Sequence, residues 1–106
     1  MFKFNHFNFN VLDLEKSLKF YEEALGLKEV RRKEAEDGSY KLIYLGDGEG
    51  HFSLELTWLR DREEKYDLGD EEFHLAITTE NYEEAYKNIK RWELLYTKIQ
   101  LWESIL

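Results

Sequence analysis

Aromatic and polar residues alternate near the N-terminus, over Phe4–Val11 (FNHFNFNV). A period of two residues is typical of a β-strand whose two faces have different environments. Asp13 can then cap the N-terminus of a helix, and Gly26 supplies a left-handed stop. The apolar stripe between these two residues consists of Leu14, Leu18, Tyr21 and Leu25. The pattern therefore predicts a strand followed by a helix that ends at Gly26.

Three further strands are predicted before residue 60. They are Leu27–Arg32, Tyr40–Leu45 and Phe52–Trp58. Turn signals separate them, first at residues 36–38 (EDG) and then at residues 46–50 (GDGEG). Residues 1–59 therefore form a predicted module with the element order βαβββ.

A charged connector, residues 60–71, separates this module from a second strand and helix. The residues of Glu72–Thr78 alternate again, and Asn81 with Glu84 resembles a capping box. The apolar stripe of the helix that follows is Tyr82, Ala85, Ile89 and Trp92. We therefore expect an α+β chain of paired βαβββ modules, in which the second module (residues 72–106) is incomplete.

Charge and composition argue against several classes of function. The chain has 15 Lys and Arg against 23 Asp and Glu, a net charge of −8, which disfavours nucleic acid or anionic lipid as a partner. It has no Cys, which excludes disulfides, zinc fingers and thiol nucleophiles. No signal peptide or membrane-spanning run is evident. We therefore expect a cytoplasmic protein with no nucleic-acid or membrane partner.

Three predicted strands each carry one potential metal ligand on the polar face: His6, Glu55 and His74. Polar residues in an antiparallel sheet usually face water, so three solvated side chains are one interpretation. Two imidazoles and a carboxylate also suit a divalent transition metal, and a curved sheet could bring them together. A shared metal site is therefore the second interpretation. His51 follows the Gly-rich run and is expected to be a solvated residue at a loop end.

Four blocks of sequence carry a resemblance to a known family. In chain order they are His6, residues 11–32 (VLDLEKSLKFYEEALGLKEVRR), residues 54–58 (LELTW) and residues 66–77 (YDLGDEEFHLAI). Together they resemble glyoxalase I (lactoylglutathione lyase) of the vicinal oxygen chelate superfamily. The resemblance covers residues 1 to about 90. It implies a glyoxalase-like fold, in which paired βαβββ modules form a half-barrel around a metal ion.

The resemblance also implies the ligands and the reaction. His6, Glu55 and His74 match three of the family's four metal ligands. The sequence lacks the insertions of longer family members and in this respect resembles the short bacterial type. That resemblance implies Ni(II) or Co(II) rather than Zn(II). The implied reaction converts the hemithioacetal of methylglyoxal and glutathione into a lactoylthioester. In it, a Lewis-acidic metal steadies the enediolate oxygens while a carboxylate moves the proton.

The resemblance further implies a homodimer that acts on a small molecule. In dimeric members the ligands come from both subunits, which would pair His6 and Glu55 of one chain with His74 of the other. Two departures bear on the thiol: Asn10 stands where many members have an Arg that grips a glutathione carboxylate, and residues 58–61 (WLRD) replace an Asn-Trp-Gly motif. Arg60 is a possible substitute for that Arg.

The C-terminal part departs further from the family. The family's fourth ligand, a Glu that also moves the proton, has no match here, so the catalytic residue is unassigned and impaired activity is expected. Residues 91–106 match nothing expected, and we expect a frameshifted or truncated gene copy, with a genuine alternative C-terminus as the other interpretation. Glu103 or a water could replace the missing ligand. The alternative function is a non-catalytic module that binds a small molecule or a metal.

Overall fold

The computed structural model describes residues 1–91 and, by their backbone, residues 99–103. Contacts within the chain define two units, residues 1–66 and residues 67–106. The boundary falls inside the charged stretch 60–71. Within the part of the chain that is described, no helix is both long and apolar enough to cross a membrane.

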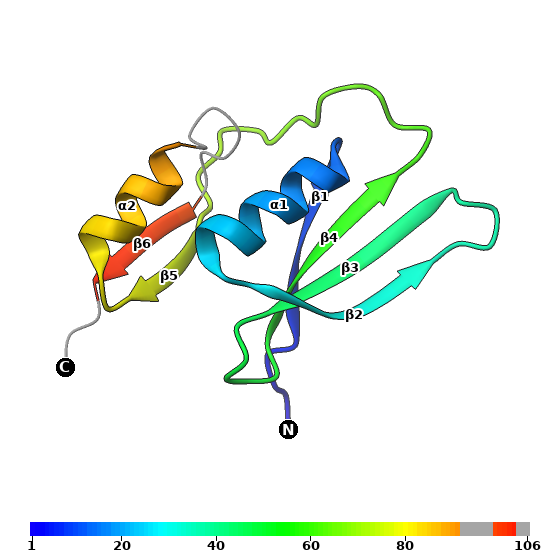
Figure 1. The fold of residues 1–106 in the computed structure, drawn as a ribbon. Helices are drawn as coiled ribbons and strands as arrows, with labels where there is room; N and C mark the ends of the chain where they lie inside the picture. The colour runs from blue at the N-terminus through cyan, green and yellow to red at the C-terminus, as the bar shows by residue number, and fades with distance from the viewer. Residues whose placement is uncertain (92–98, 104–106) are drawn as a thin grey trace. The chain divides into compact units, whose positions relative to one another are not determined.

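The first unit is a βαβββ module, as the sequence predicts (Figure 1). Its elements are β1 (His6–Val11), α1 (Leu14–Leu25), β2 (Lys28–Glu34), β3 (Tyr40–Gly46) and β4 (Ser53–Leu59). The sheet has the order β1-β4-β3-β2, with β1 parallel to β4 and the other pairs antiparallel. β1, the first strand of the unit in sequence, is thus an edge strand, and its neighbour in the sheet is β4, the last strand of the unit. Alternation of apolar and polar residues alone cannot predict this pairing.

Both ends of α1 have the predicted caps. The Asp13 carboxylate accepts a hydrogen bond from the backbone N–H of Lys16 at 3.0 Å. At the other end Gly26 has φ 69°, and the N–H groups of Gly26 and Leu27 donate to the carbonyls of Glu22 and Tyr21. This left-handed turn satisfies carbonyls that the helix leaves free, and glycine adopts it without a steric penalty.

Replacing Asp13 with Ala is expected to lower the free energy of unfolding by about 1 kcal/mol, because the cap is lost and the N–H of Lys16 loses its acceptor. Chemical denaturation would measure the change. The conservative variant Asp13→Asn keeps an accepting oxygen and is expected to stay within a few tenths of a kcal/mol of the parent. Equal losses for Ala and Asn would show that the charge, and not the cap, matters.

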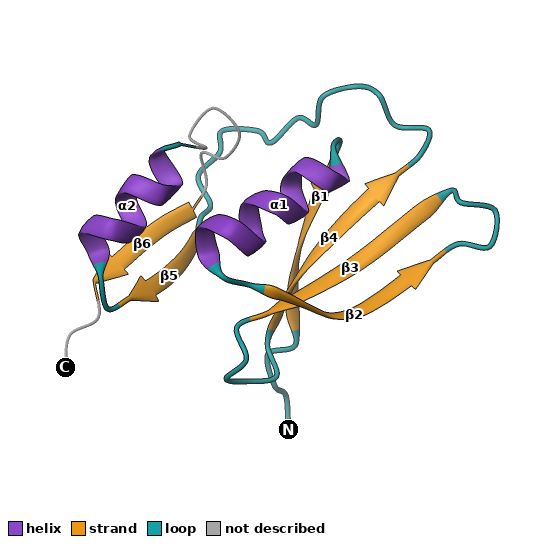
Figure 2. Cartoon of the chain, viewed as in Figure 1, coloured by secondary structure: helices purple, strands orange, loops and turns teal. Residues whose placement is uncertain are grey.

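The core of the first unit lies between α1 and one face of the sheet (Figure 2). The sheet contributes buried apolar residues from its two central strands, namely Ile43, Leu45, Leu54 and Leu56. The helix contributes Leu14, Phe20 and Tyr21, of which Phe20 is 0% exposed. Phe20 is absent from the predicted stripe, whose members Leu18 and Leu25 are only half-buried. The buried face of α1 is therefore broader than the stripe predicts.

The second unit repeats the start of the first. It contains β5 (Leu75–Thr79), α2 (Tyr82–Lys90) and β6 (Ile99–Glu103), with β5 and β6 paired in parallel. Asn81 caps α2 by accepting from the N–H of Glu84 at 3.2 Å. Here the prediction of a strand over 72–78 is wrong at its start: β5 begins at Leu75, where its pairing with β6 begins. Of the predicted α2 stripe, Trp92 lies outside the described residues.

The described side chains of α2 are not fully buried. Ala85 and Ile89 are half-buried, whereas Tyr82 is 38% exposed. Phe73, just before β5, is 37% exposed. The second unit therefore leaves more apolar surface accessible on its helix than the first, whose helix buries two aromatic rings.

Candidate functional site

The polar face of the first sheet lies opposite the face that α1 covers. Strand register places Asn8 beside Glu55, Glu55 beside Tyr44, and Tyr44 beside Arg31. Residues paired across neighbouring strands point to the same side of a sheet. These four side chains therefore form one row across all four strands, with His6 two residues before Asn8 on the same face.

Within this row, the structure brings His6 and Glu55 together. Nε2 of His6 lies 3.4 Å from Oε1 of Glu55. The side chain of Glu55 is 10% exposed and that of His6 is 38% exposed. The interpretation of Glu55 as a solvated surface residue is therefore wrong, because Glu55 lies on β4 with β1 and β3 at either side and is buried there. A buried carboxylate is costly unless a cation or hydrogen-bond donors compensate its charge.

The His6 ring is held in a defined orientation. Its Nδ1 lies 2.6 Å from Oδ1 of Asn5, and the edge of Tyr44 packs against it with ring centroids 5.5 Å apart and planes at 87°. An amide oxygen can only accept, so Nδ1 carries the proton. In the neutral imidazole, Nε2 then presents its lone pair toward the Glu55 carboxylate.

Two electron-pair donors that face each other are a favourable arrangement for a cation. Neighbouring ligands that each lie about 2.1 Å from one metal ion are separated by roughly 3.0–3.4 Å, depending on the angle between them. The 3.4 Å between His6 and Glu55 falls in that range. Metal-bound histidines also typically donate their other ring N–H to an oxygen, as His6 does to Asn5. The pair therefore fits a divalent metal.

A chain of polar contacts runs beside the pair along β1. The hydroxyl of Thr57 lies 2.6 Å from Oδ1 of Asn8 and 3.5 Å from Oε2 of Glu55. A hydroxyl has one proton to donate, and the shorter contact takes it. Asn8 then donates to Asn10 at 2.7 Å, and Asn10 to the hydroxyl of Tyr66 at 3.4 Å. This chain fixes both Asn side chains and leaves Glu55 directed toward His6.

The third predicted ligand, His74, belongs to the second unit. It lies one residue before β5, and its side chain is exposed. Within the described residues, no cluster of three or more His, Cys, Asp or Glu side chains could hold a metal ion. Among the described residues, the first unit thus brings two potential ligands together, His6 and Glu55.

The β5–β6 register bears on Glu103 as a replacement ligand. In the first unit, Glu55 pairs with the residue two positions after His6. In the second unit, the residue two positions after His74 pairs with Gln100, whereas Glu103 pairs with Thr79. The backbone register therefore places Gln100, and not Glu103, at the position equivalent to Glu55.

Two other residues named from the sequence lie outside the pair. His51 is exposed in the loop between β3 and β4, as expected. The guanidinium of Arg60 is bound to the Asp61 carboxylate at 3.0 and 3.2 Å and to the carbonyl of Asp37 at 2.8 Å. The hydrogen bond that Arg60 donates to Asp61 raises the pKa of Arg60, and the same bond lowers the pKa of Asp61. Arg60 is therefore engaged in joining the end of β4 to the β2–β3 turn.

Two residues that hold His6, Asn5 and Tyr44, are absent from the site predicted from the sequence. Asn5 comes before the strand, and Tyr44 lies in a strand with no regular alternation, so neither was a candidate. Asn5 could have been found from the sequence, because it directly precedes His6 and an adjacent amide can orient a potential metal ligand. The contact of Tyr44 depends on the pairing of β3 with β4 and has no local signal.

The fold and the site together define a βαβββ module with a His–Glu donor pair on the exposed side of its sheet. The family model for the Glyoxalase/Bleomycin resistance protein/Dioxygenase superfamily matches residues 3–93. The chain belongs to this superfamily.

Individual relatives are similar to the chain over most of its length. A lactoylglutathione lyase of Neisseria meningitidis is 41% identical over 88 residues, which are 81% of this chain and 63% of that protein. The chain therefore spans less than two thirds of this relative. Among solved structures, glyoxalase I of Leishmania major matches with a TM-score of 0.75 at 29% identity. The match covers 88% of this chain and 68% of the Leishmania chain. Glyoxalase I of Zea mays has a TM-score of 0.74 at 31% identity, over 85% of this chain and 32% of its own.

Proposed function

We propose that the chain is a lyase of the glyoxalase I type, which isomerises the hemithioacetal of methylglyoxal and a thiol to a lactoylthioester. The observation that carries the proposal is the contact of His6 with the buried Glu55 in a chain of this superfamily. The names of the relatives support it, since the N. meningitidis relative is a lactoylglutathione lyase.

A divalent metal, Ni(II) or Co(II) in preference to Zn(II), is part of this proposal. His6 and Glu55 would hold it together with His74. The metal would supply Lewis acidity toward the two adjacent oxygens of the substrate. Asn5 fixes the ring of His6, and burial on β4, between β1 and β3, fixes the carboxylate of Glu55. Both side chains are thus positioned before any ligand binds, which reduces the entropic cost of binding.

The proposal includes a homodimer in which His6 and Glu55 of one chain act with His74 of a second copy. Mixing two inactive variants, His6→Ala and His74→Ala, tests this arrangement. One of the two sites in a mixed dimer would then keep all three ligands, so metal binding is expected to return to roughly a quarter of the parent stoichiometry for random mixing. If all three ligands come from one chain, the mixture binds no better than its components.

Turnover by this chain is expected to be slow. The family's proton-moving Glu has no match in the sequence, and a positioned acid or base contributes about 10²–10⁴-fold to a rate. The assay is lactoylthioester formation from methylglyoxal and glutathione after Ni(II) or Co(II) is added to metal-free protein. We expect weak activity that requires the metal and is lost in His6→Ala. Activity that persists in metal-free protein would contradict the proposal.

The same assay separates the lyase from a binding module of this superfamily. A module that only binds a small molecule would retain its ligand after the metal is removed by a chelator, and would form no thioester with any metal. The lyase is expected to lose thioester formation on chelation and to regain it when Ni(II) or Co(II) is restored.

A further inference from the structure

A concavity of about 380 Å³ opens in the first unit near the His6–Glu55 pair, whose own side chains do not line it. Asn5 and Tyr44, the two residues that hold His6, both line it. Its other walls come from β2, through Arg31, and from the loop between β3 and β4, through His51 and several glycines. A small molecule in this concavity would therefore contact the two residues that orient His6.

The charge of the concavity is opposite to that of the whole chain. The chain has a net charge of −8, yet none of the ten described residues that line the concavity is Asp or Glu. Two of them, Arg31 and His51, carry basic groups. A concave site with a basic lining in an acidic protein favours a ligand that carries negative charge.

Arg31 is placed to bind such a ligand. Its guanidinium stacks over the ring of Tyr44, with Cζ 4.3 Å from the ring centroid. Within the described part of the chain, no side chain forms a hydrogen bond or ion pair with it. Its N–H groups are therefore available, and the stacking orients them. An ordered guanidinium binds a carboxylate with two parallel hydrogen bonds.

A β-bulge is the reason why Arg31 faces this side of the sheet. The register between β2 and β3 shifts between Glu29 and Arg31, so that Val30 is the extra residue. Glu29 therefore pairs with Leu45 on the side of α1, while Arg31 pairs with Tyr44 on the polar face. Bulges re-aim side chains in this way and are common near functional sites.

We propose that Arg31 binds a carboxylate of the thiol part of the substrate, while the reacting carbons lie at His6 and Glu55. The inference rests on the proposed function and deepens it by naming the residue that would bind the carboxylate of the substrate's thiol part. Arg31 and Glu55 lie two strands apart in one row, a separation of roughly 10 Å between their backbones. The carboxylate of a peptide-sized thiol spans this distance, whereas that of a two-carbon thiol does not.

Two other polar side chains of the first unit already have hydrogen-bond partners. Asn10 donates to the hydroxyl of Tyr66. Arg60 is bound to Asp61 and Asp37. Arg31 is thus the guanidinium that shares a face with the metal ligands and keeps its donors free.

The test compares a charged probe with an uncharged one. The probes are S-methylglutathione and its diethyl ester, which differ in the carboxylates. The protein is the full chain, and binding is measured by calorimetry, so turnover is not required. The parent is expected to bind the acid more tightly than the ester, and Arg31→Gln is expected to weaken acid binding about tenfold or more while changing ester binding less than about twofold.

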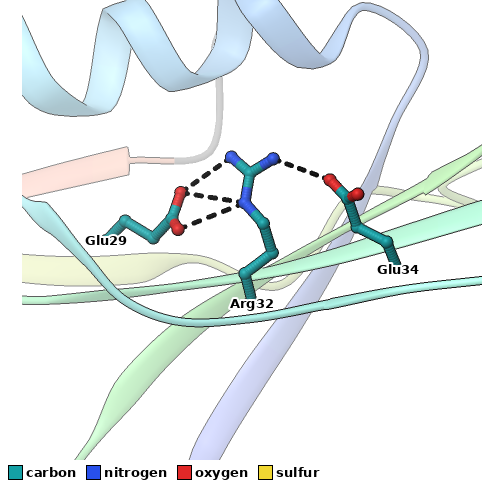
Figure 3. A network of polar contacts seen from close by, with 3 residues as sticks. All are labelled: Glu29, Arg32 and Glu34. Atoms are coloured by element: carbon teal, nitrogen blue, oxygen red, sulfur yellow. Dashed lines mark hydrogen bonds and ion pairs between the residues drawn. The ribbon is translucent and has the colours of Figure 1, made fainter.

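Arg32 provides a matched control on the same strand. It lies on the opposite face, where its guanidinium is bound to Glu29 at 2.8 Å and Glu34 at 2.8 Å (Figure 3). The hydrogen bond to Glu29, and then that to Glu34, raise the pKa of Arg32. Arg32→Gln therefore removes the same charge from the chain without touching the concavity, and acid binding is expected to stay within about twofold of the parent.

Each outcome decides the proposal. Arg31→Lys keeps the charge but loses the planar guanidinium with its paired N–H donors. We therefore expect an affinity for the acid between that of the parent and that of Arg31→Gln. If Arg31→Gln weakened binding of the acid and of the ester equally, Arg31 would only support Tyr44. If it left acid binding unchanged, Arg31 would make no contact with the carboxylate. Either result overturns the proposal, as does a parent protein that binds neither probe. Intact Arg31-dependent binding without any metal-dependent thioester formation would refute the lyase activity alone.

Discussion

Replacing Glu55 with Gln is expected to reduce the affinity for Ni(II) or Co(II) by at least about a hundredfold while leaving the fold intact. The change removes the anionic oxygen 3.4 Å from Nε2 of His6 and keeps the shape of the side chain. Residues that merely orient a metal ligand already contribute about 10–100-fold to affinity, so the loss of a ligand exceeds this. Titration of metal into metal-free protein measures the effect.

The same substitution is expected to leave the metal-free protein as stable as the parent, or more so. Glu55 is buried among β1, β3 and β4, and a neutral amide is cheaper to bury than a carboxylate. Glu22→Gln on the exposed side of α1 is the control and should change neither stability nor metal affinity. If Glu55→Gln bound metal as tightly as the parent, Glu55 would not be a ligand.

Replacing Phe20 with Ala is expected to lower the free energy of unfolding by about 3–5 kcal/mol. The Phe20 ring is 0% exposed and packs with its edge against Tyr21, with centroids 5.0 Å apart. Its removal leaves a cavity between α1 and the sheet that the neighbouring side chains fill only in part. Total stabilities of domains are about 5–15 kcal/mol, so this loss is a large fraction. Denaturation in urea measures it.

Phe4→Ala is the matched control for this prediction. Phe4 precedes β1 and is 92% exposed, so the same change of side chain is expected to cost less than about 0.5 kcal/mol. Similar losses at Phe4 and Phe20 would contradict the assignment of the core to the α1 side of the sheet.

The local features of the fold could be predicted from the sequence because short-range chemistry determines them. The cap at Asp13, the stop at Gly26 and the turns between strands depend on residues within a few positions of one another. The strands of the first unit were located to within one or two residues for the same reason. The βαβββ order followed from these signals, and the resemblance to glyoxalase I implied that such modules occur in pairs.

The parts that could not be predicted depend on register and on tertiary packing. The bulge at Val30 reverses the faces of β2, whose sequence KEVRRKE has no alternation to reveal it, so Arg31 was no candidate. The burial of Phe20 needs a helix face wider than one apolar stripe. The polar face of β4 suggested a solvated Glu55, but side chains on the strands at either side cover it.

Proton NMR of the Co(II)-loaded chain tests the central claim, that His6 and His74 act with Glu55 at one metal site, most directly. Each histidine bound through one ring nitrogen contributes a strongly shifted, exchangeable N–H signal from the other nitrogen, and the chain has three histidines. Two such signals are expected, one lost in His6→Ala, the other lost in His74→Ala, and both retained in His51→Ala. A spectrum with no shifted signal, or one whose signals depend on His51 instead, would contradict it.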